Sequence, residues 1–131
     1  MPKTLKDAAL KVTDPYPAQN TTKNFTAIDL EQVLPDVGAE HFEVLISTAA
    51  TTCATGQTIT FTIQDSADNS SFAAVAQCAT LVLTGSSNAT AATTRRWRLP
   101  SNVRRYIRMS VVTSATTGDI TAVSPVFELV F

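Results

Sequence analysis

The sequence has few of the residues from which catalytic and metal sites are built. Its 131 residues include one histidine, two cysteines and one tryptophan. Zinc chemistry and Ser-His-Asp chemistry both need more histidines, or cysteines at ligand spacing, than this chain offers. We therefore predict that the protein is not an enzyme and that it carries no cofactor and no metal.

The chain also lacks a long apolar run and a strong net charge. No window approaches the roughly 20 consecutive apolar residues of a transmembrane helix, and the first twelve residues, MPKTLKDAALKV, lack the apolar core of a signal peptide. The formal net charge of −1 gives no overall field that would draw the protein to a polyanion. These absences predict synthesis in the cytoplasm, with no membrane and no nucleic acid among the partners.

Cysteine is too scarce for a disulfide scaffold. Cys53 and Cys78 lack the CxxC spacing of metal or redox sites. Small buried hydrophobes are the favoured interpretation, and a single disulfide bridge is the alternative.

Threonine and alanine are abundant, with 21 and 18 copies. Threonine is β-branched and suits the half-exposed surface of a sheet. The clearest pattern lies in Gly56–Phe72, where Ile59, Phe61 and Ile63 alternate with polar residues. This period of two predicts a strand with one apolar face, followed by a polar turn and a returning strand. A second sheet is needed to cover that face.

Further short strand patterns are separated by turn residues along the rest of the chain, and none has a helical period. About eight strands at this spacing predict an all-β fold, an antiparallel β-sandwich of jelly-roll type in a single domain. The other expected strands are 24–30, 41–48, 72–77, 79–84, 95–99, 105–113 and 120–131, with a flexible tip at 85–94.

The first 23 residues have only a weak pattern. Pro15 and Pro17 remove two backbone donors and favour extended geometry in the residues before them. We expect an extended N-terminal arm over 1–23, docked rather than frayed, and a β-sandwich domain over 24–131.

Acidic residues in the turn after Ile63 allow two interpretations. Asp65, Asp68 and Asn69 could offer oxygen ligands to calcium. Their side chains could equally bond their own backbone and close the hairpin. The spacing lacks the further ligands and the glycine of a dedicated calcium loop, which favours the turn.

Arginine is concentrated in one part of the chain. All six arginines fall between Asn69 and Gly118, an interval without aspartate or glutamate. On strands, Arg96 and Arg98 share the face opposite Trp97 and Leu99. The cluster predicts contact with nucleic-acid phosphates, docking to an acidic protein surface, or a solvated face paired with the acids of 29–43. Of the two functional interpretations, docking to protein is preferred, because the chain lacks the positive excess and exposed stacking aromatics of nucleic-acid binders. As partner-binding residues we select Pro15, Tyr16, Pro17, Arg95, Arg96, Arg104 and Arg105.

Several segments resemble the small decoration, or cement, proteins of tailed-phage capsids. The segments are Gln64–Phe72, Arg98–Arg108, Lys6–Thr13, Tyr16–Ala18 and Ile28–Leu30, so the similarity runs over nearly the whole chain. The resemblance implies a jelly-roll sandwich on the capsid exterior. It also implies a homotrimer that sits between major capsid proteins and reaches neighbours with its N-terminal arms.

A second resemblance is to discoidin-type carbohydrate-binding jelly rolls, which also carry an acidic turn before an aromatic residue and an Arg-Tyr-Ile-Arg-like strand. This chain departs from them because Trp97 lies between arginines and its loops lack the aromatic clusters of a sugar platform. A carbohydrate-binding module is therefore the alternative function, and a tail or fibre adaptor protein is a further one.

Overall fold

The computed structural model describes residues 11–30, 42–114 and 120–130. The named elements within them are all β-strands. They are β1 Lys11–Thr13, β2 Thr22–Asn24, β3 Ile28–Asp29, β4 Glu43–Thr48, β5 Thr51–Thr52, β6 Thr58–Ser66, β7 Ala73–Ala74, β8 Leu81–Thr84, β9 Ala89–Thr90, β10 Thr93–Arg98, β11 Tyr106–Thr113 and β12 Val126–Val130.

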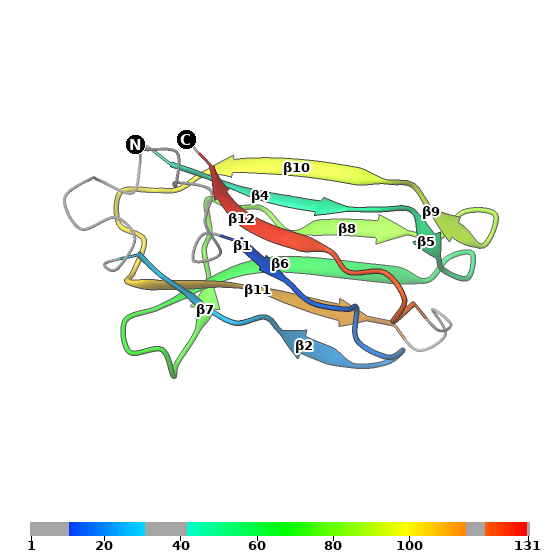
Figure 1. Ribbon diagram of the computed structural model, residues 1–131, viewed down its shortest axis with the longest axis horizontal. Helices are drawn as coiled ribbons and strands as arrows, with labels where there is room; N and C mark the ends of the chain where they lie inside the picture. Colours follow the sequence, from blue (N-terminus) through cyan, green and yellow to red (C-terminus); the bar gives the residue numbers. More distant parts are fainter. Residues whose placement is uncertain (1–10, 31–41, 115–119, 131) are drawn as a thin grey trace.

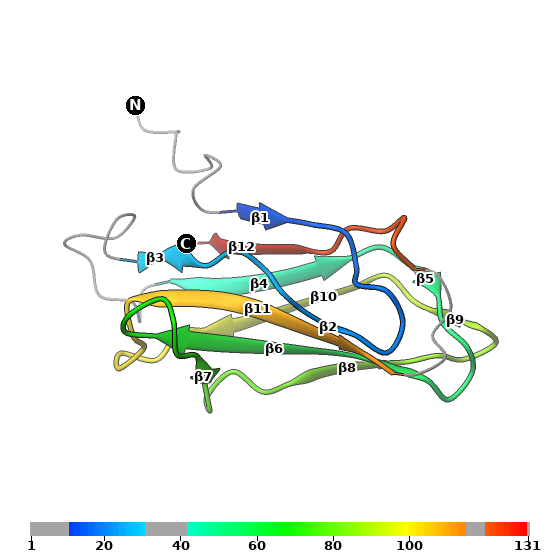
Figure 2. The same cartoon turned by 90° about the horizontal axis from the view of Figure 1, so that it is seen from below.

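Ten of the strands form two antiparallel sheets packed face to face (Figures 1 and 2), and β5 and β9 form a separate two-stranded sheet. The first sheet has the order β1-β12-β4-β10, and the second is built on β2-β11-β6-β7. We call them the β4 sheet and the β6 sheet. The prediction of an all-β antiparallel sandwich is confirmed.

Short strands share the two edges of the β6 sheet. β2 and β3 pair with successive parts of β11, and β7 and β8 pair with successive parts of β6. In the β4 sheet the first strand, β1, lies beside the last, β12. Such nesting of early beside late strands is compatible with the jelly-roll type, which stays a prediction.

The alternation seen in the sequence places the core as expected. Ile59, Phe61 and Ile63 of β6 are fully buried, while the threonines between them are half-buried on the other face. β11 pairs with β6 over eight residues, from Tyr106 opposite Ser66 to Thr113 opposite Ile59. Burial of each large side chain contributes about 1.5–3 kcal/mol, so this pair of strands supplies much of the apolar core.

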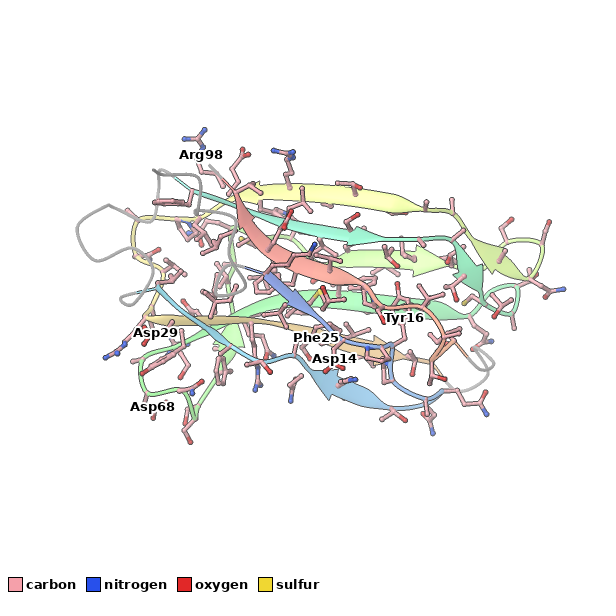
Figure 3. The ribbon with its side chains drawn as sticks, viewed as in Figure 1. Asp14, Tyr16, Phe25, Asp29, Asp68 and Arg98 are labelled. Atoms are coloured by element: carbon pink, nitrogen blue, oxygen red, sulfur yellow. The ribbon has the colours of Figure 1, made fainter. Side chains whose placement is uncertain are left out.

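The N-terminal segment differs from the predicted arm. β1 pairs with β12 in the β4 sheet, and β2 pairs with β11 in the β6 sheet, so residues 11–24 cross from one sheet to the other. Tyr16 lies on this crossing (Figure 3) and packs edge-on against Phe61, with ring centroids 5.9 Å apart. From residue 11 the segment is therefore part of the sandwich, and the predicted boundary at residue 24 is wrong. Residues 1–10 lie outside the described part.

The expected flexible tip at 85–94 contains ordered pairing. β5 pairs with β9, and Ser86 and Ala89 exchange both of their backbone hydrogen bonds around a two-residue turn. Ser87 and Asn88 both have positive φ, 53° and 62°, as a type I′ turn requires. Gly85 before the turn is needed because a Cβ there would collide with the carbonyl oxygens of the Cys53–Ala54 stretch.

Both cysteines are buried and free, as the favoured interpretation predicted. Burial raises the pKa of the Cys53 thiol, and it raises the pKa of Cys78 to about 11 with a smaller contribution from the charge of Asp65. They pack in the apolar core cluster.

Candidate functional site

The basic edge of the β4 sheet is formed by β10, which pairs with β4 and with no other described strand. Arg96 lies opposite Leu45 and Arg98 opposite Glu43, which puts these two arginines on the outer face of the sheet. Figure 3 shows Arg98 at this edge of the molecule. Trp97 alternates with them and packs against the core, as the sequence predicted.

Arg95, Arg96 and Arg98 are the exposed cations of this edge, and the first two were selected from the sequence. Arg96 meets Glu43 at 3.5 Å, a long contact between side chains that are 58% and 35% exposed. Exposed pairs of this kind contribute about 0.2–1 kcal/mol, so Arg96 is readily redirected to another acceptor. The Arg95 side chain is exposed and makes no hydrogen bond or ion pair with the described residues. Partner binding by these two residues stays a prediction.

Arg104 is committed to the fold. Its backbone N donates to Asp65 Oδ2 at 3.0 Å, and its Nε and Nη2 donate to Asp65 Oδ1 at 2.9 and 2.6 Å. Nη2 also donates to the Asp65 carbonyl at 2.7 Å. The guanidinium holds the buried end of β6, although the Arg104 side chain is still 40% exposed. These hydrogen bonds give Arg104 a structural role, and partner binding by it stays a prediction.

Arg105 forms a bidentate pair with Asp29. Its Nε and Nη2 donate to the two carboxylate oxygens, both at 2.9 Å, across 76 positions of sequence. The Asp29 side chain is 20% exposed, and Figure 3 places it at one end of the molecule. This pair ties β3 to the start of β11. For Arg105 and Arg96 the structure therefore agrees with the alternative of pairing with the acids of 29–43.

Tyr16 and Pro17 are buried, and of the three N-terminal residues selected from the sequence only Pro15 is exposed. Tyr16 is 1% exposed, and its hydroxyl lies 2.7 Å from Thr48 Oγ1. Burial raises the pKa of Tyr16 to about 12, against the lowering effect of the Thr48 hydrogen bond. Tyr16 and Pro17 are thus contacts within the sandwich, and their selection as partner-binding residues is corrected.

The acidic turn closes the hairpin between β6 and β7. Asp68 Oδ1 accepts hydrogen bonds from the backbone N of Ser70 and Ser71, both at 2.9 Å, and from the Ser66 hydroxyl at 2.8 Å. These donors, the Ser71 amide first, lower the pKa of Asp68 to about 2. Asn69 has φ 60°, which an asparagine tolerates at a turn. The geometry is that of the turn interpretation, since Asp65 faces Arg104 instead.

One arginine with distinctive surroundings was missed as a site residue. The Arg108 guanidinium lies 3.8 Å from the centre of the Phe72 ring, and its Nε donates to Gln64 Oε1 at 2.8 Å. Desolvation lowers the pKa of Arg108. The register places Arg108 directly opposite Gln64 on the outer face of the β6 sheet. Sequence alternation gave the face, but only the pairing of β11 with β6 shows the neighbours.

Two features, a metal-binding cluster and a membrane-spanning helix, are not found in the described part of the chain. It contains no group of three or more histidine, cysteine or acidic side chains placed to hold a metal ion. The described residues also include no helix that is long and apolar enough to cross a membrane.

Comparison with known proteins gives a family. The sequence profile of the Bbp16 family matches residues 17–125. The chain belongs to the Bbp16 family. No curated protein matches it. Among solved structures, one titled "Crystal structure of PirA" aligns over 92% of this chain and 91% of its own, with 11% identity and a TM-score of 0.49.

The matched region begins at Pro17, one residue after Tyr16, and ends at Pro125, just before β12. It therefore includes Arg108, Phe72, the basic edge and the hairpin of the acidic turn.

Proposed function

We propose that this Bbp16-family protein is a structural virion protein that binds the outer surface of the capsid and cements neighbouring major capsid proteins. The proposal rests on the resemblance of Gln64–Phe72 and Arg98–Arg108 to capsid decoration proteins. It includes assembly as a homotrimer, a jelly-roll connectivity, synthesis in the host cytoplasm and no part for nucleic acid, membrane or cofactor.

The basic edge of β10 is the observation that supports this proposal most. The Arg95 side chain makes no polar contact with the described residues, and among them the Arg96 side chain has only the long contact to Glu43. Exposed charges at the rim of an interface steer association and set its orientation. An acidic patch on a capsid subunit is the complementary surface. β10 presents both arginines along the edge of the sheet, Arg96 on the outer face and Arg95 on the opposite side of the strand.

The direct experiment is co-sedimentation of the purified protein with shells assembled from the major capsid protein. The double variant Arg95→Glu/Arg96→Glu should bind at least about tenfold more weakly, because two attractive contacts become repulsive. Lys11→Glu is the matched control, since it reverses an exposed charge at the far edge of the same sheet. Absence of wild-type binding to the shells would overturn the proposed function.

The proposed arm contact is tested by truncation at residue 10. The structure shows that a cut at residue 18 would remove β1 and Tyr16 and so would damage the fold. Removal of 1–10 spares every strand in the described ranges. A 1–10 deletion that stays folded and binds capsids as the full chain does would show that these residues make no essential contact.

The alternatives are separated by simple measurements. For a glycan-binding module, Trp97 is poorly suited as a platform because it packs against the core. A glycan array with hits, together with no capsid binding, would favour that module. For a tail or fibre adaptor, quantitative mass spectrometry of virions decides, since a shell protein is present in hundreds of copies and an adaptor in a handful. Native mass spectrometry tests the homotrimer.

A further inference from the structure

The outer faces of the two sheets differ in chemistry. The face of the β4 sheet carries charges of both signs on neighbouring strands: Lys11, Glu43, Arg96, Arg98 and Glu128. Mixed charge of this kind is typical of a solvated surface. Most of the β6 sheet's outer face is uncharged.

Register defines the uncharged face row by row. Thr22, Val112, Thr60 and Val82 lie side by side across four strands, and Asn24, Ser110 and Thr62 form the next row. Val82 and Val112 are 50% and 42% exposed, and they are the exposed large hydrophobic residues of the described part. Both flank Thr60 on one surface. An uncharged surface with exposed valines has the composition of an interface core, where charged residues are depleted.

Arg108 lies in the following row, between the uncharged rows and the Arg105–Asp29 end of the sheet. No described carboxylate pairs with it, whereas Arg104, Arg105 and Arg96 each have one. The Phe72 ring covers one side of the Arg108 guanidinium, and Gln64 Oε1 accepts a hydrogen bond from its Nε. Together they fix the plane of the guanidinium. The terminal nitrogens have no hydrogen-bond partner among the described residues.

A fixed guanidinium with free terminal nitrogens suits a planar acceptor with two oxygens. A carboxylate is such an acceptor, and it would supply the charge that Gln64 lacks. A phosphate backbone would also fit Arg108 itself, but polyanion binding draws on several cations. The neighbouring rows provide none, so the face favours protein.

We propose that the outer face of the β6 sheet docks against a partner protein, and that Arg108 binds a carboxylate of that partner. The inference rests on the proposed function, in which the partner is a major capsid protein. It adds a second contact surface to the basic β10 edge. A protein that cements neighbouring subunits needs two such surfaces, and joint engagement of both raises avidity.

The test uses co-sedimentation with the same shells and four full-length variants. Arg108→Gln should weaken binding at least about thirtyfold, because the partner carboxylate would be buried without its counter-charge. Arg108→Lys should weaken binding by an intermediate amount, since lysine keeps the positive charge but cannot donate two parallel hydrogen bonds to one carboxylate. Val112→Arg places bulk and charge in the centre of the face and should also abolish tight binding. Lys11→Gln, which removes one exposed charge from the other sheet, should bind as wild type does.

The outcomes separate the two proposals. Thermal melts first establish that each variant is folded at the assay temperature. If wild type fails to bind shells, the proposed function fails. If wild type binds and both Arg108→Gln and Val112→Arg bind equally well, the docking face is wrong while the function stands. Binding of wild type to DNA that Arg108→Gln abolishes would overturn the assignment of a protein partner.

Discussion

Arg104 and Asp65 are joined by four hydrogen bonds, three to the carboxylate and one to the backbone carbonyl. The Asp65 side chain is 13% exposed, and Asp65 is the last residue but one of β6, where the strand leads into the acidic turn. The pair therefore connects the centre of the β6 sheet to the loop that precedes β11. It has the geometry of a structural clamp.

We expect Asp65→Ala to lower the free energy of unfolding by about 2–3 kcal/mol, because it leaves the Arg104 donors without their acceptor. Glu43→Ala is the matched control, since it removes a carboxylate from the exposed, longer pair with Arg96 and should cost under about 1 kcal/mol. Urea titrations of both variants check the difference. Equal losses would contradict the distinction between clamp and surface pair.

Tyr16→Phe tests the crossing of the N-terminal segment between the sheets. The change removes the hydroxyl that meets Thr48 Oγ1 and should lower stability by about 1 kcal/mol. Tyr16→Ala also empties the space beside Phe61 and should cost about 3–5 kcal/mol. Thermal and chemical denaturation give both values. A truly detached arm would show neither loss, so wild-type stability of Tyr16→Ala would contradict the structure.

Local patterns in the sequence foretold much of the sandwich. The alternation around Ile59, Phe61 and Ile63 was enough to place the inner face of β6, because a nine-residue strand repeats its period several times. β1 and β2 have three residues each and carry no readable period. Their membership in the sheets follows from pairing with β12 and β11, far along the chain.

The candidate site depended on such distant pairings even more. Arg104, Arg105 and Arg108 look alike in the sequence, yet one is clamped by Asp65, one pairs with Asp29 and one stacks on Phe72. These partners lie between 36 and 76 positions away along the chain. The sequence shows where the arginines lie along the chain. Only the register of β11 with β6 and β3 shows which partner each arginine has.

The hydrogen bonds that Asp68 accepts in the acidic turn predict that the stability of the folded protein decreases at low pH. The pKa of Asp68 is about 2 in the folded protein, below the value of 3.8 for an unperturbed aspartate, so its contribution to stability is present above about pH 4 and is lost as pH falls toward 2. Asp68→Asn keeps an acceptor oxygen but cannot titrate. We expect its urea midpoint to fall less than that of wild type between pH 5 and pH 2. Glu128→Gln, a carboxylate lost from β12, serves as the control, and identical pH profiles for wild type and Asp68→Asn would refute the expectation.

The buried thiols make a prediction about labelling. Cys53 and Cys78 are free and buried, and burial raises the pKa of both, so little thiolate forms at pH 8 and reagents reach it only when the structure opens. Ellman's reagent should therefore react slowly with the folded protein and should reveal both thiols at once in denaturant. Ser101→Cys, which adds an exposed thiol in a turn, should react within the mixing time and provides the positive control. Rapid reaction of the native thiols would contradict their burial. If no thiol reacts after denaturation without reductant, the two cysteines form a disulfide.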